Sequence, residues 1–478
     1  MALLIAAFLT LLNASEIPVG PARLTMPDLV RSWSWVDQSL AAKEMNLEER
    51  RTMSRRLDDM TMLFFRNDIG GVGRAMDDLS LGMMLGDDVT DAHRVAAALL
   101  LKLSDQEDGP SLKARWRYQP PSPSDPIAMT LVLDQRNGSS HDVELVVSPG
   151  PDGWSIQFDE SDLASLPATA TLTLALRLAD GTVIPQGRWE RTVEPFSETR
   201  KRYLEGIKAM DQGDAHAVFR SRAARLIDRL PPMDITGYVL DRNQLRAELA
   251  EELEALARGE DPYLNRAGDT WYEITAGSTR TPVRLYVPEQ VVAAGTPAPL
   301  LIALHGAGGN EHFFMDGCGD GAITDLADEH GMIVVSPSTY VMASSMEPLE
   351  AVVRTISSRY PVDQDRIFLL GHSLGGMTAM GLASARPEMV DAVVAIAGGA
   401  PFPKKTAFPP VLAYAAERDF IVSGDMIESS AQAAQAAGAP VTPRRPDGTG
   451  HLTIVMDVLP ESVEWLMSLP PSESSDGR

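Results

Sequence analysis

Short, unbroken apolar runs dominate the C-terminal part of the chain. They read LLIALH, IVVSPS, IFLLG, VVAIAGG and VLAYAA, and stretches with helical character lie between several of them. A strand that is apolar on both faces must be buried on both faces, which happens when helices cover a parallel sheet on each side. The sequence therefore predicts an α/β domain over residues 268–470, with a mostly parallel, doubly covered sheet.

The preceding residues change character several times. The chain has 478 residues, and at roughly 100–200 residues per domain this length predicts two to four domains. Alternating runs such as MTLVLDQ and ATLTLALRL, separated by Asn-Gly and Asp-Gly, predict a small antiparallel β-sandwich. The expected organisation is a helical region at 24–106, the β-sandwich at 108–196, a helical connector at 197–265, the α/β domain at 268–470 and a disordered tail at 471–478.

Apolar spacings of three and four residues support the first helical region. Val95, Leu99 and Leu103 follow this spacing, and the helical pattern extends from about Met26 to Leu103. The glycines between residues 70 and 73 interrupt it and predict a turn between helices.

The first residues of the chain are strongly apolar. The run from Ala2 to Leu12 contains one threonine and no charge, and it is shorter than the roughly 17–25 residues of a membrane-spanning helix. It predicts a signal peptide at residues 1–15, with cleavage after Ala14 or Ser15, and export to the periplasm or the outside of a bacterial cell. The alternative is a buried first helix, because no basic residue precedes Arg23.

Charge and cysteine content exclude several classes of protein. Lys and Arg total 42 against 66 Asp and Glu, so the formal net charge is −24. Such a charge repels phosphate backbones and makes a nucleic acid an unsuitable partner. The single cysteine, Cys318, excludes an intramolecular disulfide and a cysteine-based metal cluster.

A Gly-x-Ser-x-Gly motif, Gly371-His372-Ser373-Leu374-Gly375, follows the apolar run IFLL and precedes the small-residue helix GGMTAMGLASA. This context is that of a nucleophilic serine on a strained turn between a strand and a helix. Side chains at Gly371 and Gly375 would collide with the neighbouring elements.

A second glycine-rich loop, His-Gly-Ala-Gly-Gly, begins at His305. A tetrahedral oxyanion needs two preorganised N–H donors, and we expect them from the backbone of Leu374, after the serine, and of Ala307, after Gly306. A phosphate-binding loop is a weaker alternative, because no Lys-Ser/Thr pair follows.

The serine needs a histidine as base and a carboxylate to orient that histidine, in the chain order Ser, acid, His. His451 is the only histidine after the serine. Asp419, after the run VLAYAA, is the first choice of acid, and Asp425 in the same loop is the second. Asp447 is too close to His451 in sequence, and Glu417 is expected to point away.

The other histidines of this region are assigned structural or solvated positions. His305 is expected to form hydrogen bonds behind the glycine-rich loop, and His372 to pack beneath or beside the site. His312 and His330 fall in a helical stretch and are expected to be solvated.

Residues from about 270 to 470 resemble the α/β-hydrolase superfamily. The segments PLLIALHGAGGN, VDQDRIFLLGHSLGGMTA, AAERD and GTGH are similar to the polyhydroxybutyrate depolymerase and feruloyl esterase-like branch. The run from Asp363 to Gly376 is shared with peptidase-like members near the prolyl oligopeptidases. In contrast to many depolymerases and feruloyl esterases, this chain has HGAGG in place of an HGC loop and has one cysteine.

The resemblance implies hydrolysis without a cofactor or metal. It implies Ser373, Asp419 and His451 as the catalytic triad and Leu374 and Ala307 as oxyanion donors. The leading hypothesis is a serine esterase that cleaves a small-molecule or polymer ester through an acyl-enzyme, with no integral membrane span. The alternatives are a prolyl-oligopeptidase-like serine peptidase and a non-catalytic envelope or binding protein with a degenerate hydrolase domain. The sequence is silent on oligomeric state.

Overall fold

The chain is described by a computed structural model, which defines two compact units, each assembled from segments distant in sequence. The predicted signal peptide up to Ala14 and the predicted tail lie outside the described residues. Those residues are 15–106, 109–135, 138–151, 153–192, 196–209, 213–227, 235, 239–404 and 406–470. Unit 1 consists of Met1–Lys43, Leu63–Lys208 and Arg225–Ala250, and unit 2 of Glu44–Met62, Ala209–Ala224 and Glu251–Arg478. Across the described part of the chain, no helix has the length and apolar character needed to cross a membrane.

Unit 1 contains an eight-stranded sheet with the order β2-β3-β1-β6-β5-β4-β7-β8. The strands are β1 (Ser15–Gly20), β2 (Leu99–Gln106), β3 (Gly109–Trp116), β4 (Ile127–Gln135), β5 (Ser140–Gly150), β6 (Gly153–Phe158), β7 (Ala170–Leu178) and β8 (Val183–Arg191). Neighbours pair antiparallel except β1 and β3, which are parallel. Strand β1 thus joins the β2–β3 hairpin to the other five strands.

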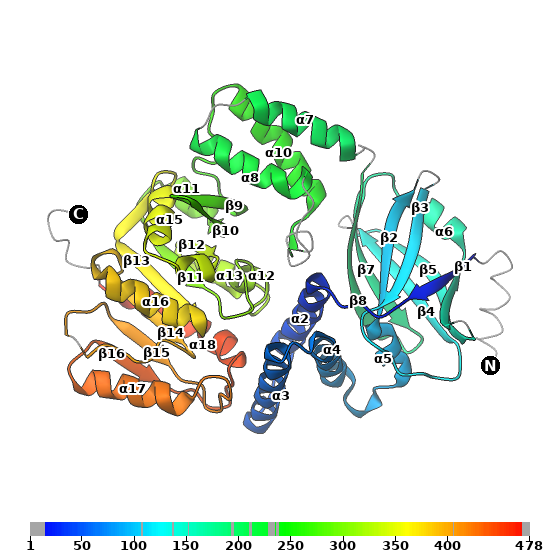
Figure 1. Cartoon of the computed structure of the whole chain (residues 1–478), viewed down its shortest axis with the longest axis horizontal. Helices are drawn as coiled ribbons and strands as arrows, with labels where there is room; N and C mark the ends of the chain where they lie inside the picture. The colour runs from blue at the N-terminus through cyan, green and yellow to red at the C-terminus, as the bar shows by residue number, and fades with distance from the viewer. Residues whose placement is uncertain are drawn as a thin grey trace. The chain divides into compact units, whose positions relative to one another are not determined.

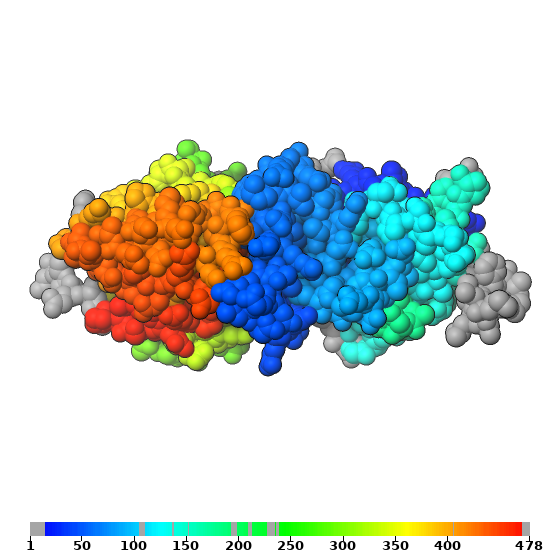
Figure 2. Space-filling model, turned by 90° about the horizontal axis from the view of Figure 1, so that it is seen from below, coloured from blue at the N-terminus to red at the C-terminus, as the bar shows by residue number. Residues whose placement is uncertain are grey.

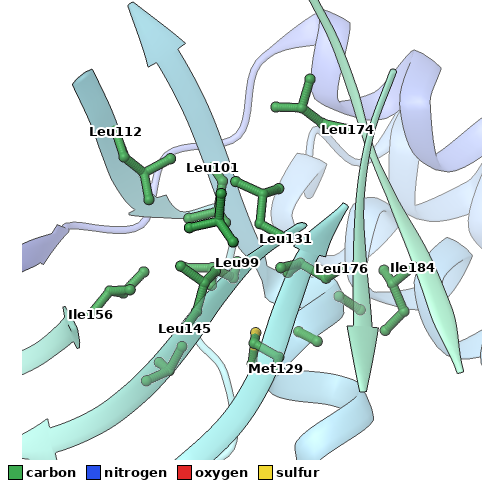
Figure 3. Packing of buried hydrophobic residues seen from close by; sticks show 14 of the residues in the cluster. Leu99, Leu101, Leu112, Met129, Leu131, Leu145, Ile156, Leu174, Leu176 and Ile184 are labelled. Atoms are coloured by element: carbon green, nitrogen blue, oxygen red, sulfur yellow. The ribbon is translucent and has the colours of Figure 1, made fainter. Parts of the chain in front are cut away.

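One apolar core lies between these strands (Figure 3). Leu101, Leu131, Leu145 and Leu176 come from four different strands and are almost completely buried in it. The helices of this unit are α2 (Met26–Ala41), α4 (Ile69–Leu85), α5 (Asp91–Ala98), α6 (Glu160–Ala164), α7 (Phe196–Ala209) and the first part of α10 (Arg242–Ala257).

Three details of unit 1 differ from the sequence prediction. The helical pattern ends at Ala98, and Leu99 and Leu103 lie on strand β2, where buried leucines alternate with exposed positions such as Lys102. The sheet is not purely antiparallel, because β1 pairs with β3. The glycines at 70–73 do not form a turn: they lie in the first turns of α4, where Asp68 caps the helix by accepting a hydrogen bond from Gly71 N.

Unit 2 contains the predicted α/β sheet, with the order β16-β15-β14-β13-β11-β12-β10-β9. Its strands are β9 (Gly268–Ala276), β10 (Thr279–Val287), β11 (Ala298–Leu304), β12 (Ile333–Pro337), β13 (Val362–His372), β14 (Ala392–Ile396), β15 (Val411–Tyr414) and β16 (Val441–Arg444). The six strands from β16 to β12 in this order are mutually parallel, and β10 is antiparallel to both β12 and β9. The mostly parallel sheet agrees with the predicted fold class.

Helices cover both faces of this sheet (Figure 1). Leu301, Phe368 and Val394 of the central strands pack on one face against α13 (Ala322–His330) and α18 (Thr453–Ser468). On the other face α16 (Leu374–Ala385) packs against β11, β13 and β14. The remaining helices of the α/β region are α11 (Glu289–Ala294), α12 (Phe313–Asp316), α14 (Thr339–Met342), α15 (Glu347–Ser357) and α17 (Gly424–Ala436).

Unit 2 also takes in residues that precede the α/β domain. Most of helix α3 (Leu47–Phe65), predicted as part of the helical region at 24–106, belongs to it, as do parts of α8 (Asp214–Ile227) and α10. Buried Arg222 of α8 pairs with buried Glu252 of α10 at 3.0 Å and donates to the Trp271 carbonyl of β9 at 3.0 Å. A buried charge is stable only with such partners. These bonds therefore tie the parts of α8 and α10 in unit 2 to the edge of the sheet.

Candidate active site

Ser373 lies at the turn between β13 and α16. Its backbone has φ 54° and ψ −113°, a region that side-chain-bearing residues rarely adopt. The turn is held by a hydrogen bond from Ser373 N to the Ile396 carbonyl at 2.8 Å, on the neighbouring strand β14. The serine side chain therefore stands at the C-terminal edge of the parallel strands, at the N-terminus of a helix.

The glycines around the turn allow the backbones to approach closely. A Cβ at Gly371 would lie 2.2 Å from the Gly375 carbonyl oxygen, and one at Gly375 would lie 1.9 Å from the Leu304 carbonyl oxygen. Gly398, which the sequence argument did not single out, has the same role: its Cβ would lie 2.3 Å from the Ser373 carbonyl oxygen. The signal for Gly398 was the glycine pair that follows the apolar run VVAIA.

The structure brings Ser373, His451 and Asp419 together. His451 Nε2 lies 3.0 Å from Ser373 Oγ, and His451 Nδ1 lies 2.7 Å from Asp419 Oδ2. The second oxygen of Asp419 accepts hydrogen bonds from Ile421 N at 2.8 Å and Val422 N at 2.7 Å. Both oxygens of this buried carboxylate thus accept hydrogen bonds, and its orientation toward the imidazole is fixed.

The other acidic residues near His451 in sequence are directed elsewhere. The Asp425 side chain is 82% exposed and pairs with Arg445 at 2.7 Å. Asp447 is exposed. Glu417 points away from the imidazole and accepts a hydrogen bond from Gly448 N at 2.5 Å.

The predicted oxyanion donors lie on two segments that pass next to the serine. A Cβ placed on Gly306 would lie 3.3 Å from the Ser373 Cβ, so the loop after β11 passes next to the serine and carries Ala307 beside it. Leu374 is the first residue of α16, and the first four amides of a helix have no acceptor within that helix. The helix dipole adds a partial positive charge at the same end.

His305 supports this loop from behind, as expected. Its Nδ1 donates to the Gly306 carbonyl at 2.8 Å, and its Nε2 accepts from Thr339 N at 3.0 Å. Burial lowers the pKa of His305, which favours this neutral tautomer. Tyr340 Oη also accepts from Gly308 N at 2.7 Å, so both ends of the glycine-rich loop are fixed.

His372 packs beside the site. Its ring is 4.8 Å from the ring of His451 and 5.8 Å from that of Phe313, centroid to centroid, and its Nε2 donates to the His451 carbonyl at 2.8 Å. Burial and the neighbouring His451 hold the pKa of His372 well below its usual range. A neutral His372 therefore positions the backbone of His451.

His312 was expected to be solvated but is buried, and His330 is half-buried at a helix end. His312 is 2% exposed, and its Nδ1 accepts from Arg284 Nη1 at 2.5 Å. Arg284 also pairs with Asp316 at 2.6 Å. The sequence argument missed this because the arginine that faces His312 lies on β10, well before it in the chain.

No group of three His, Cys, Asp or Glu side chains within the described ranges is arranged to hold a metal ion.

Residues 322–451 match the model of the dienelactone hydrolase family. Feruloyl esterase B of Neurospora crassa is 28% identical over 140 residues, which cover 26% of this chain and 46% of the relative. Feruloyl esterase B of Thermothelomyces thermophilus is 25% identical over 136 residues, covering 25% and 45%. This chain thus spans about half the length of these relatives.

Among solved structures, a fluorophosphonate-binding serine hydrolase of Staphylococcus aureus aligns with 42% of this chain and 100% of its own, at 15% identity and a TM-score of 0.36. A ferulic acid esterase aligns with 42% and 99%, at 15% identity and a TM-score of 0.35.

The C-terminal region of this chain is an α/β-hydrolase domain, as the mostly parallel sheet, the strand–serine–helix turn and the family match together define. Within that superfamily it is similar to the feruloyl esterases, in agreement with the sequence resemblance.

Proposed function

We propose that this protein is a serine esterase that cleaves carboxylic esters through an acyl-enzyme. The observation that carries the proposal is the continuous pair of hydrogen bonds from Ser373 through His451 to Asp419, at 3.0 and 2.7 Å. A serine hydroxyl becomes a strong nucleophile when a histidine accepts its proton, and a buried carboxylate stabilises the imidazolium that forms. The similarity to feruloyl esterases supports the choice of ester chemistry.

The reaction runs in two halves. In the first, Ser373 Oγ attacks the ester carbonyl while His451 Nε2 takes the serine proton, and that proton then passes to the departing alkoxide. In the second, His451 removes a proton from water, the resulting hydroxide attacks the acyl-serine, and the acid leaves while Ser373 regains its proton. Backbone N–H groups of Leu374 and Ala307 stabilise the oxyanion in both halves, a contribution of about 10²–10³ in rate per donor.

The surroundings of the serine favour a substrate with an apolar or aromatic group. Met377, one turn after the serine, is 50% exposed, and Tyr340, bonded to the glycine-rich loop, is 52% exposed. Phe420, next to Asp419, is 60% exposed. Three large apolar side chains exposed on segments that adjoin the reacting residues suit an acyl or aryl group better than a charged one.

The test is turnover of p-nitrophenyl acetate, with labelling of Ser373 by a fluorophosphonate. We expect the wild-type protein to do both, and Ser373→Ala to lose labelling and at least about 10³-fold in kcat. Unchanged turnover in Ser373→Ala would assign the activity to another group. A panel of methyl ferulate, p-nitrophenyl butyrate and a prolyl peptide anilide decides between esterase and peptidase. Folded wild-type protein that neither labels nor turns over any of these would fit the non-catalytic alternative.

We propose further that residues 1–15 are an export leader, with cleavage after Ala14 or Ser15. The first described strand, β1, starts at Ser15 and pairs with β6 from that residue onward. Cleavage after Ala14 would therefore leave every described pair of this sheet intact. Sequencing the amino terminus of the native protein tests this, and an intact Met1 would refute it.

A further inference from the structure

One face of helix α3 packs directly against the two loops that carry Asp419 and His451. We call residues Leu47–Met62 of this helix, which belong to unit 2, the α3 segment. Its buried face carries Met53, Ser54, Leu57 and Asp58. In Figure 2 the blue residues of the segment lie against the orange C-terminal residues that they contact.

Asp58 contacts both catalytic loops at once. Its Oδ1 accepts a hydrogen bond from His451 N at 2.9 Å, and its Oδ2 accepts one from Phe420 N at 3.2 Å, directly after Asp419. Asp58 is 1% exposed. A buried carboxylate is costly unless its oxygens are bonded, and here the two bonds go to the backbone of the proposed base and to the residue that follows the proposed acid.

Ser54, one turn earlier on the helix, makes a second contact with the loop that carries His451. Its Oγ donates to the Gly448 carbonyl at 2.8 Å and lies 2.8 Å from Thr453 Oγ1. A Cβ at Gly450 would lie 2.8 Å from the Ser54 Cβ, so the glycine before His451 is what lets this loop approach the helix. Residues of both the helix and the loop that carries His451 therefore form this contact.

Arg51 and Glu417 form a further contact, between the α3 segment and the loop that carries Asp419. Arg51 Nη2 lies 2.8 Å from Glu417 Oε1. Glu417 in turn accepts a hydrogen bond from Gly448 N, in the loop that carries His451. The two loops that must present Asp419 and His451 to each other are therefore joined both directly and through the α3 segment.

The geometry points to Asp58 as a positioning residue of the active site, through which the α3 segment sets the distance and angle between His451 and Asp419. This inference rests on the proposed function. A triad works only when its members are held within a fraction of an ångström, and backbone bonds to both loops are an effective way to do this. This carboxylate comes from helix α3, far upstream of the α/β-hydrolase domain in the chain.

The negative charge of Asp58 has a further effect on the site. The ionisable side chains closest to Asp58 are those of Asp419 and His451. The Arg51–Glu417 pair lies nearer the start of the helix. Burial and the nearby Asp419 raise the pKa of Asp58 to about 6, although the two backbone hydrogen bonds act to lower it. Below that pH a proton occupies one oxygen of Asp58, and one of the two backbone N–H groups loses its acceptor, so the wild-type kcat/KM profile should contain an ionisation near pH 6 that Asp58→Asn lacks.

The experiment compares Asp58→Asn with the wild-type protein and with Asp59→Asn, the neighbouring exposed aspartate on the same helix. An asparagine has the same shape but only one acceptor oxygen, so one of the two backbone N–H groups loses its partner. For Asp58→Asn we expect a fall of about 10-fold in kcat on p-nitrophenyl acetate, a smaller change in KM and a kcat/KM profile without the Asp58 ionisation. Asp59→Asn should match the wild-type protein in all three.

Hydrogen–deuterium exchange gives a readout that does not depend on turnover. Peptides covering residues 415–424 and 446–456 should exchange faster in Asp58→Asn and at the wild-type rate in Asp59→Asn. A folded Asp58→Asn with kcat and pH profile within about twofold of wild type overturns the inference. If Asp58→Asn does not fold, Ser54→Ala takes its place, and unchanged kcat and exchange there also overturn it. If the wild-type protein has no activity and takes no label, the proposed function fails, and the exchange experiment still decides whether Asp58 holds the loops.

Discussion

Asp419 and His451 are joined by a hydrogen bond of 2.7 Å between Oδ2 and Nδ1, and the Asp419 side chain is fully buried. Asp425, six residues later in the same loop, reaches Arg445 instead and is mostly exposed. The two aspartates thus have the same charge and neighbouring positions, yet only one of them meets the imidazole.

Replacing these aspartates one at a time tests their separate roles. Asp419→Asn should lower kcat on p-nitrophenyl acetate by about 10³–10⁴-fold, because an amide presents an N–H or a weaker acceptor to the imidazole and no longer stabilises its charged form. Asp425→Asn should stay within about twofold of wild type. Equal losses in the two variants would contradict the assignment.

Two glycines of helix α16 should respond to alanine in opposite ways. In Gly375→Ala the new Cβ would lie 1.9 Å from a backbone carbonyl, so we expect a loss of at least about 3 kcal/mol in the free energy of unfolding, or failure to fold. Gly381 has nothing within 4 Å of its Cβ position, and Gly381→Ala should gain about 0.5–1 kcal/mol from helix propensity. Urea unfolding measures both, and a stable Gly375→Ala protein would contradict the described turn.

The Arg51–Glu417 pair should make stability depend on pH in the acid range. Hydrogen bonds from Arg51 and Gly448 N lower the pKa of Glu417, so the contribution of the pair is present above the ordinary pKa of about 4.5 and is lost as pH falls through the lower folded value. Arg51→Gln should therefore be less stable than wild type at pH 7, and the difference should shrink at pH 3.5. Urea midpoints at the two pH values measure it, and Glu48→Gln, which alters the exposed second partner of Arg51, is the control.

His372 should make the protein less stable in mild acid. Burial lowers the folded pKa of His372, so the unfolded chain takes up a proton below pH 6.5 that the folded protein resists. Stability should fall as pH drops from 7.5 to 5.5, and it should fall less in His372→Gln, which keeps an N–H donor for the His451 carbonyl. An identical pH dependence in the two proteins would show that His372 is not the group responsible.

The local sequence was enough to locate Ser373 and the parallel sheet, because the strand, the turn and the helix that define them are adjacent in the chain. The acid was harder: Asp419 and Asp425 share one loop, and the backbone amides of residues 421 and 422 decide which carboxylate turns inward. Leu99 and Leu103 fit both a helical and a strand period, and strand pairing with β3 selects the strand.

Asp58 and His312 could not be assigned from local pattern for a different reason. Asp58 reads as a charged residue on an ordinary amphipathic helix, and its partner His451 lies 393 residues further on. His312 reads as a solvated helical residue until Arg284 of β10 is placed against it. Buried polar pairs of this kind depend on tertiary contacts that have no periodicity in the sequence.

The position of the α3 segment in the chain has a consequence for how the protein is made. Asp58 of the segment is synthesised 362 and 393 residues before the two loop residues, Phe420 and His451, that donate hydrogen bonds to it. The buried face of the segment therefore stays without these partners until both loops have been synthesised. A shorter protein that begins at the first residue of the α/β domain would lack this helix, and grafting the domain onto another protein would require grafting the helix with it.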